Sequence, residues 1–179
     1  FLAGIAVNSL GHAHPALVKA ISEQAAKLMH CSNIYYTDIQ AKAVKEIIET
    51  TGFDRVFLAN SGAEANEGAI KLARKYGHQK NEGKYRIITA VHSFHGRTMM
   101  TVTATGQPKY QQGYEPLPAG FDYVPYGDLE ALREAMDEDV CCVLLEPIQG
   151  EGGVHVPSDT YLHEARLSVS YTHLRAHET

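Results

Sequence analysis

The sequence predicts an α/β domain with a mostly parallel sheet, and three observations support this fold class. Apolar runs rich in β-branched residues alternate with helix-forming stretches between Arg55 and Leu145. The run Val140–Leu145 is apolar throughout, which is typical of a parallel strand buried on both faces. A turn of small residues, Asn60–Ala63, joins a predicted strand directly to a predicted helix. An N-terminal helical segment precedes this domain.

The N-terminal segment, residues 1–50, is expected to form two helices. Pro15 suits the first turn of the first helix, because its fixed φ angle matches helical geometry. Apolar residues follow it at helical spacing, namely Leu17, Val18, Ile21, Ala25 and Leu28. The second helix runs roughly from Ile39 to Thr50, and Gly52 ends it.

Residues 51–167 contain the alternating elements of the predicted large domain. Strands are expected at residues 55–59, 86–90, 122–124 and 140–145, and helices at residues 63–76, 98–105 and 128–136. Ligands of parallel sheets bind outside the carboxyl ends of the strands. Three turns follow strands and are therefore expected to line one site: Asn60–Ala63, His92–Thr98 and Glu146–Gly153.

The turn before the helix at residue 63 has the pattern of a phosphate cradle. Ser61 with Glu64 three residues later matches a capping box, and Gly62 lets the backbone approach a ligand closely. The free N–H groups and the positive dipole end of the helix favour an anion. An ordinary strand–turn–helix unit with a good N-cap explains these residues equally well.

The other two turns also carry residues suited to chemistry. The ring of Phe94 can stack on a planar cofactor, and Arg97 can hold a carboxylate through two parallel hydrogen bonds. Glu146 and Glu151 place two carboxylates after the buried strand. The structural alternatives are a polar turn with Phe94 packed in the core, and an exposed glycine-rich loop with solvated charges.

Composition and charge argue against several classes of function. The 179 residues carry a net charge of −5 without a basic block, which argues against a nucleic-acid partner. No apolar run approaches the length of a membrane span, and no signal peptide opens the chain. The chain also lacks an initiator Met. We therefore expect a cytoplasmic protein whose true start lies upstream.

Known short motifs for metals and nucleotides are missing from the sequence. The three cysteines show no Cys-x-x-Cys spacing, and the pairs His12/His14 and His92/His95 lack an obvious third ligand. Neither the Gly-x-Gly of a dinucleotide fingerprint nor the Gly-Lys-Ser/Thr of a P-loop occurs. The sequence therefore predicts no metal ligands.

Four stretches nevertheless occur in an order that is typical of one enzyme family: Asn60–Glu67, Ser93–Thr98, Ala104–Tyr110 and Leu145–Glu151. With them the chain resembles the class III aminotransferases, which are fold type I enzymes that use pyridoxal 5′-phosphate. The resemblance runs from Phe1 to about Leu167. It implies a partial fold type I large domain and, in the full-length enzyme, a homodimer.

The resemblance also implies which residues would hold the cofactor. They are Ser61, Gly62, Ala63, Phe94, His95 and Glu146. The backbone N–H groups of Gly62 and Ala63 would contact the phosphate, and Phe94 would stack on the pyridine ring. Glu146 would lie near the pyridine edge.

Three residues are implied to bind substrate. Arg97 would hold a carboxylate, Glu151 would manage a second arginine, and Tyr36 would line the substrate mouth. The opening residues 1–12 look most like the N-acetylornithine branch. Ornithine aminotransferases tend to carry Tyr near the position of Ile5, and an apolar Ile5 suits an acylated α-amino group.

The implied reaction moves the δ-amino group of N-acetylornithine to 2-oxoglutarate in arginine biosynthesis. Ornithine, succinylornithine and 4-aminobutyrate remain alternative amino donors. From a different class, a non-catalytic α/β module that binds a phosphate ligand also remains open.

Two departures from the family pattern matter. The Schiff-base Lys and the pyridinium-binding Asp of the family do not appear, so we expect no catalytic residue and no activity from this chain alone. Residues 168–179 resemble the conceptual translation of a sequencing adapter. Their apolar side chains are therefore expected to show no consistent burial, namely those of Val169, Tyr171 and Leu174.

Overall fold

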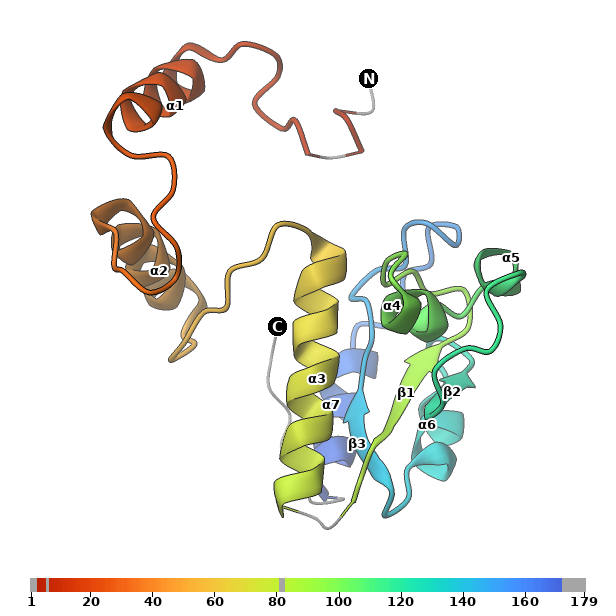
Figure 1. The fold of residues 1–179 in the computed structure, drawn as a ribbon. Helices are drawn as coiled ribbons and strands as arrows, with labels where there is room; N and C mark the ends of the chain where they lie inside the picture. Colours follow the sequence, from red (N-terminus) through yellow and green to blue (C-terminus); the bar gives the residue numbers. More distant parts are fainter. Residues whose placement is uncertain (1–2, 6, 81–82, 172–179) are drawn as a thin grey trace. The chain divides into compact units, whose positions relative to one another are not determined.

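The chain forms two compact units, Phe1–Val56 and Phe57–Thr179, shown in Figure 1. The structure, a computed structural model, describes residues 3–5, 7–80 and 83–171. The first unit contains helices α1, Pro15–Lys27, and α2, Asp38–Thr51, as predicted. Thr37 caps α2, because its Oγ1 accepts the N–H of Gln40 at 3.3 Å, and Gly52 ends α2 in the left-handed region at φ 75°.

The second unit is built on a parallel sheet, which confirms the predicted fold class. Strand β1, Arg86–Ala90, lies between β2, Phe121–Val124, and β3, Val140–Val143. Ile88 pairs in register with Asp122 on one side and with Val143 on the other. All carboxyl ends of the three strands therefore lie at one edge of the sheet.

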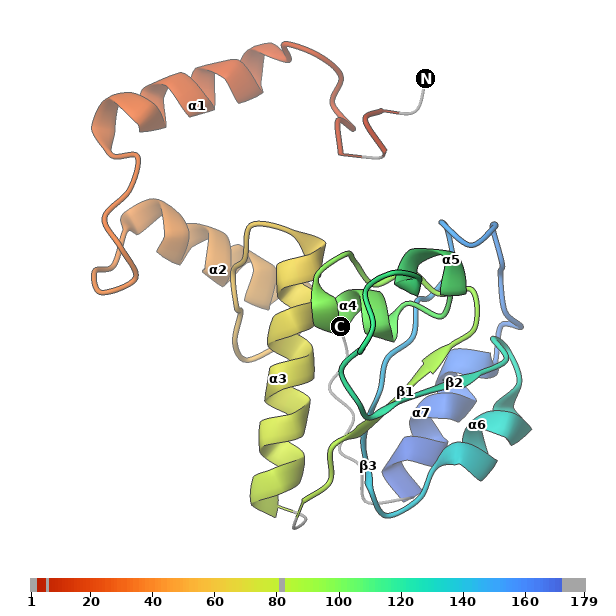
Figure 2. The same cartoon turned by 45° about the vertical axis from the view of Figure 1, so that its right-hand side comes forward.

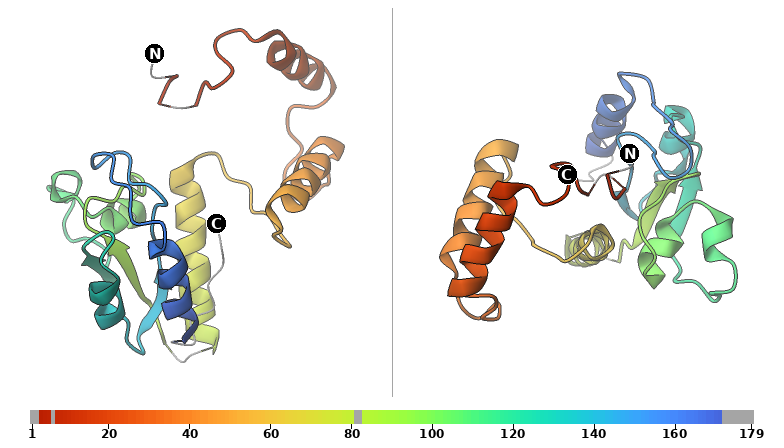
Figure 3. Two further views of the ribbon diagram at one scale, coloured as in Figure 1. Left: turned by 180° about the vertical axis from the view of Figure 1, so that it is seen from behind. Right: turned by 90° about the horizontal axis from the view of Figure 1, so that it is seen from above.

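Helices cover both faces of this sheet (Figures 1 and 3). Helices α3, Gly62–Lys80, and α4, Met99–Ala104, pack on one face, and α6, Leu129–Ala135, and α7, Tyr161–Tyr171, pack on the other. The short helix α5, Pro108–Gln111, follows α4. This layered arrangement is typical of α/β domains.

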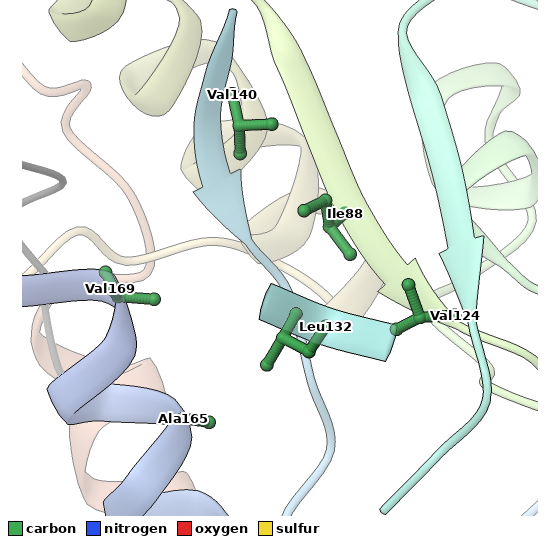
Figure 4. Close-up of a cluster of buried hydrophobic side chains, with 6 residues drawn as sticks. All are labelled: Ile88, Val124, Leu132, Val140, Ala165 and Val169. Carbon is green, nitrogen blue, oxygen red and sulfur yellow. The ribbon is translucent and has the colours of Figure 1, made fainter. Parts of the chain in front are cut away.

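Adjacent residues of β1 supply the two halves of the core, because successive side chains of a strand point to opposite faces. Ile87 packs with Ile70 of α3 and Ala104 of α4. Ile88 packs in the larger cluster that Figure 4 shows. That cluster consists of Ile88, Val124, Leu132, Val140, Ala165 and Val169.

One predicted strand is wrong, and the predicted end of another is too late. Residues 55–59 form no strand, and Phe57 and Leu58 are 74% and 47% exposed. A mostly apolar extended run needs a neighbouring strand to pair with, and this one has none among the described residues. Strand β3 ends at Val143 rather than residue 145, at an edge of the described sheet.

Gly77 does not end α3, which continues to Lys80. A Cβ at Gly77 would lie 2.6 Å from the carbonyl oxygen of Lys84 and 2.8 Å from Cβ of Cys141. The glycine is therefore required by close packing of α3 against the sheet, and not by a helix terminus.

Helix α7 also differs from expectation, because it carries the chain into residues expected not to pack. Val169 is only 7% exposed, and it follows Ala165 by four residues on the same helical face. Ser168 accepts a hydrogen bond from Nε of Arg133 at 3.0 Å. The prediction that Val169 stays unburied is wrong. Leu174 and the side chain of Tyr171 lie outside the described residues.

Candidate functional site

The first predicted turn forms a capped helix start with two free donors. Oγ of Ser61 accepts the N–H of Glu64 at 3.2 Å, as the capping box predicts. The carboxylate of Glu64 reaches back to the backbone N–H of Asn60 at 2.7 Å rather than to Ser61, and this hydrogen bond lowers the pKa of Glu64. The N–H groups of Gly62 and Ala63 have no hydrogen-bond partner among the described residues.

The second turn approaches this helix start closely. A Cβ at Gly96, whose φ is 132°, would lie 2.8 Å from Cβ of Ala63. Nδ2 of Asn66 donates to the carbonyl of His95 at 2.8 Å. Figure 2 shows the N-terminal end of α3 beside α4, near the ends of the strands. A Cβ at Gly62 would instead meet no atom within 4 Å, so the space in front of that glycine is open.

His95 connects the second turn to strand β1. Its side chain is buried, and Nε2 lies 2.9 Å from Oγ1 of Thr89 on β1. Its backbone N–H donates to Oγ1 of Thr105 at 2.9 Å. Burial lowers the pKa of His95 to about 4, so the ring is neutral at pH 7. The structure thus places the imidazole against β1, where it fixes the backbone that carries Phe94 and Arg97.

The third turn joins the second through hydrogen bonds and close packing. The backbone N–H of Phe94 donates to Oε2 of Glu146 at 3.1 Å, and burial raises the pKa of this carboxyl. Nε2 of Gln149 donates to the carbonyl of Val91 at 2.9 Å. A Cβ at Gly152 would collide with the carbonyl oxygen of His92. The three predicted turns therefore meet at one edge of the sheet.

Tyr110 links the residues of these turns, and sequence reasoning did not identify it as a site residue. Its hydroxyl donates to Oε1 of Glu151 at 2.7 Å. Its ring centroid lies 5.6 Å from that of Phe94 in an edge-on arrangement, and Cζ of Arg97 lies 5.6 Å above the ring. The signal available in the sequence was its position in the stretch Ala104–Tyr110, which carries part of the resemblance.

Tyr36, the remaining predicted site residue, belongs to the first unit. Its side chain is fully exposed there, as is most of Ile5. The predicted contacts of both residues with substrate stay predictions.

No three His, Cys, Asp or Glu side chains among the described residues are grouped to hold a metal ion. No helix of the described chain has the length and apolar character needed to cross a membrane.

A cavity of about 730 Å³ lies beside the third turn, lined by residues that include His92, Tyr126, Gln149 and His155. None of the predicted site residues lines it.

Comparison with known proteins decides the family. The family profile described as aminotransferase class-III matches residues 1–170. The chain belongs to the class III aminotransferases. The family uses pyridoxal phosphate, and one structure of ornithine aminotransferase from Toxoplasma gondii shows partial occupancy of this cofactor at its active site.

Among curated class III aminotransferases, the acetylornithine aminotransferase of Caldanaerobacter subterraneus subsp. tengcongensis is 59% identical over 167 residues, covering 93% of this chain and 42% of that protein. The acetylornithine aminotransferase of Methanocaldococcus jannaschii is 53% identical over 171 residues, again covering 93% and 42%. This chain therefore spans about two fifths of the length of the curated relatives that it matches.

Solved aminotransferases share the fold of this chain. The ornithine aminotransferase of Toxoplasma gondii ME49 has a TM-score of 0.93 at 34% identity, covering 97% of this chain and 42% of that one. The acetylornithine aminotransferase of Elizabethkingia anophelis has a TM-score of 0.79 at 36% identity, covering 97% and 43%.

Proposed function

We propose that this chain supplies the phosphate cradle and a carboxylate-binding arginine to a pyridoxal-phosphate-dependent aminotransferase. The enzyme transfers the δ-amino group of N-acetylornithine to 2-oxoglutarate. The observation that carries this proposal is that the helix start with the free Gly62 and Ala63 N–H groups packs against Gly96, in the turn that bears Phe94 and Arg97. The identities of 53–59% to acetylornithine aminotransferases support the choice of amino donor.

The geometry around Gly62 fits the phosphate of the cofactor. Two unpaired N–H groups at a helix start, with open space where a Cβ of residue 62 would lie, suit an anion. The hydroxyl oxygen of Ser61 accepts the N–H of Glu64, so its own proton is available to donate to a phosphate oxygen. These three residues would hold the phosphate, and the half-buried ring of Phe94 would face the pyridine ring.

Pyridoxal phosphate supplies the electron-withdrawing ring that carries the amino group between the two substrates. This chain would bind the cofactor and orient it. Glu146 holds the backbone of Phe94 in place through its N–H, and neutral His95 fixes the same turn from the side of β1. Both residues therefore act on the cofactor through Phe94 in this proposal.

Arg97 is suited to bind the substrate carboxylate. Its guanidinium lies 6.0 Å from the ring centroid of Phe94 and 5.6 Å from that of Tyr110. It forms no ion pair with an acidic side chain in the part of the chain that is described. A guanidinium that lies near two rings and has no counter-ion can bind a carboxylate through two parallel hydrogen bonds.

The resemblance implies a homodimer, and we include that assembly in the proposal.

The test uses the complete enzyme, which we define as the Caldanaerobacter relative with its matching segment replaced by residues 1–167 of this chain. Steady-state kinetics with 2-oxoglutarate are expected to give N-acetylornithine a kcat/KM at least about tenfold above those of ornithine and 4-aminobutyrate. The unmodified relative serves as the control, so that any difference belongs to this chain. Succinylornithine is measured beside them, because a Pseudomonas aeruginosa relative at 53% identity carries both activities in its name. A higher kcat/KM for ornithine or 4-aminobutyrate contradicts the proposal.

A further inference from the structure

Helix α3 contacts the turn that carries Arg97 on both sides of that residue. The backbone N–H and carbonyl of Arg97 form no hydrogen bond among the described residues, so its place depends on its neighbours. The carbonyl of His95, two residues earlier, accepts Nδ2 of Asn66 at 2.8 Å. The hydroxyl of Thr98, the next residue, donates to Oε1 of Glu67. Both partners lie on α3, so the helix whose first residues form the cradle also anchors the turn around Arg97.

Close packing of Gly96 adds a third contact between the turn and the helix. A Cβ at Gly96 would lie 2.8 Å from Cβ of Ala63 and 2.6 Å from Oγ1 of Thr101. Such packing brings two segments together without fixing a direction, whereas a hydrogen bond requires its donor and acceptor to be aligned. The orientation of the turn on α3 therefore depends on the hydrogen bonds to Asn66 and Glu67.

Thr98 connects the carboxylate of Glu67 to the backbone beside Arg97. An ionised carboxylate only accepts hydrogen bonds, so the single proton of the Thr98 hydroxyl points to Glu67. Oγ1 of Thr101 lies 2.7 Å from Oγ1 of Thr98 and accepts the N–H of Thr98 at 3.0 Å. Glu67 forms no ion pair within the part of the chain that the structure describes. Its hydrogen bond with Thr98 has a charged acceptor, which makes it roughly twice as strong as a neutral one.

We propose that Glu67 is a positioning residue, which acts through Thr98 to keep the guanidinium of Arg97 where it can bind the carboxylate of the substrate. This inference rests on the proposed function of Arg97. The ring centroids of Phe94 and Tyr110 lie 6.0 and 5.6 Å from Cζ of Arg97. Cation–π contacts are weak at exposed sites, and Arg97 is exposed, so the anchored backbone decides where its guanidinium can reach.

Phe94 does not depend on the hydrogen bond between Glu67 and Thr98. Its backbone N–H donates to Oε2 of Glu146 at 3.1 Å, and the N–H of the next residue, His95, donates to Oγ1 of Thr105 at 2.9 Å. The cradle consists of backbone N–H groups, and Ala in place of Glu67 does not weaken a helix. Loss of the Glu67 side chain should therefore weaken the binding of a carboxylate and leave the binding of the cofactor nearly unchanged.

The experiment measures glutarate binding to the complete enzyme that carries Glu67→Ala. Glutarate is a dicarboxylate with no amino or oxo group, so it binds without reacting, and calorimetry gives its dissociation constant. Glu67→Ala is expected to raise that constant about tenfold, as the loss of one hydrogen bond to a charged group implies. KM for 2-oxoglutarate is expected to rise by a similar factor, with kcat and the dissociation constant of pyridoxal phosphate each within about twofold.

Three further variants separate positioning from a general structural effect. Glu67→Gln keeps an acceptor oxygen for Thr98 and is expected to raise the glutarate constant by less than about threefold. Thr98→Val removes the same hydrogen bond from its other side, so the double variant Glu67→Ala, Thr98→Val is expected to bind no more weakly than the weaker single variant. Glu134→Ala is the matched control, because it removes an exposed carboxylate from α6, on the opposite face of the sheet. That variant is expected to leave the constant unchanged.

The inference is overturned if Glu67→Ala binds glutarate as tightly as the unmodified enzyme, or if its loss and that of Thr98→Val add in the double variant. It is also overturned if Glu67→Ala weakens glutarate binding further in a protein that already carries Arg97→Ala, because the effect then does not pass through Arg97. An equal loss of pyridoxal phosphate affinity contradicts it as well. Calorimetry needs no turnover, so an enzyme that binds glutarate as expected but transfers no amino group from N-acetylornithine contradicts the proposed function alone.

Discussion

Replacing Gly62 with Asp in the complete enzyme is expected to weaken the binding of pyridoxal phosphate by about 100-fold, which corresponds to about 2.7 kcal/mol. A Cβ at residue 62 points into open space, so the new carboxylate extends to where the phosphate would bind. It places a negative charge beside the incoming phosphate and competes for the N–H groups of Gly62 and Ala63. Fluorescence titration of the cofactor-free protein with pyridoxal phosphate measures the affinity.

The same substitution should not destabilise the fold, which makes the prediction specific. Asp is favoured in the first turn of a helix, where it interacts well with the helix dipole. The Tm of the cofactor-free Gly62→Asp protein is therefore expected to equal or exceed that of the unmodified protein. Ala69→Asp is the control, since Ala69 is exposed on the same helix and lies about two turns farther on. If Gly62→Asp retains the normal affinity, the cradle assignment is wrong.

The 179-residue chain by itself is expected to transfer no amino group to 2-oxoglutarate and to form no stable link with pyridoxal phosphate at one defined lysine. Covalent catalysis with this cofactor needs an activated lysine amine. All nine lysines of the chain lie outside the family's Schiff-base context, and every one except Lys84 is exposed. Borohydride reduction followed by peptide mass spectrometry is the measurement.

Lys109 is the lysine to examine in that spectrum, because its ammonium lies beside Tyr110 in the site. Diffuse labelling over several exposed lysines agrees with the prediction. Labelling confined to Lys109 or another single lysine, together with amino transfer, would show that this chain carries a catalytic amine after all.

The sheet could be predicted from the sequence wherever local pattern and tertiary packing agree. Strand β1 was predicted at its observed bounds, because its apolar residues pack on both faces and it has a partner on each side. Residues 55–59 are also mostly apolar but have no partner strand among the described residues, and a local sequence pattern does not reveal which strands pair. Gly77 resembles a helix stop, but the contacts that require it come from the backbone of Lys84 and from Cys141, which is 64 residues away in sequence.

In the candidate site, too, local features could be predicted from the sequence and long-range contacts could not. Ser61 and Glu64 could be found from their spacing, because helix caps are local. The burial of His95 depends on Thr89 and Thr105, which approach it only in the folded domain. Tyr110 meets Glu151 across 41 residues, and α5 has only four residues, which is too short for a periodic signal.

The crystal structure of the complete enzyme with pyridoxal phosphate tests the central claim most directly. We expect a phosphate oxygen within about 3 Å of the backbone nitrogens of Gly62 and Ala63, with the pyridine ring against Phe94. A phosphate bound elsewhere, with those two N–H groups paired to protein atoms, would contradict the account.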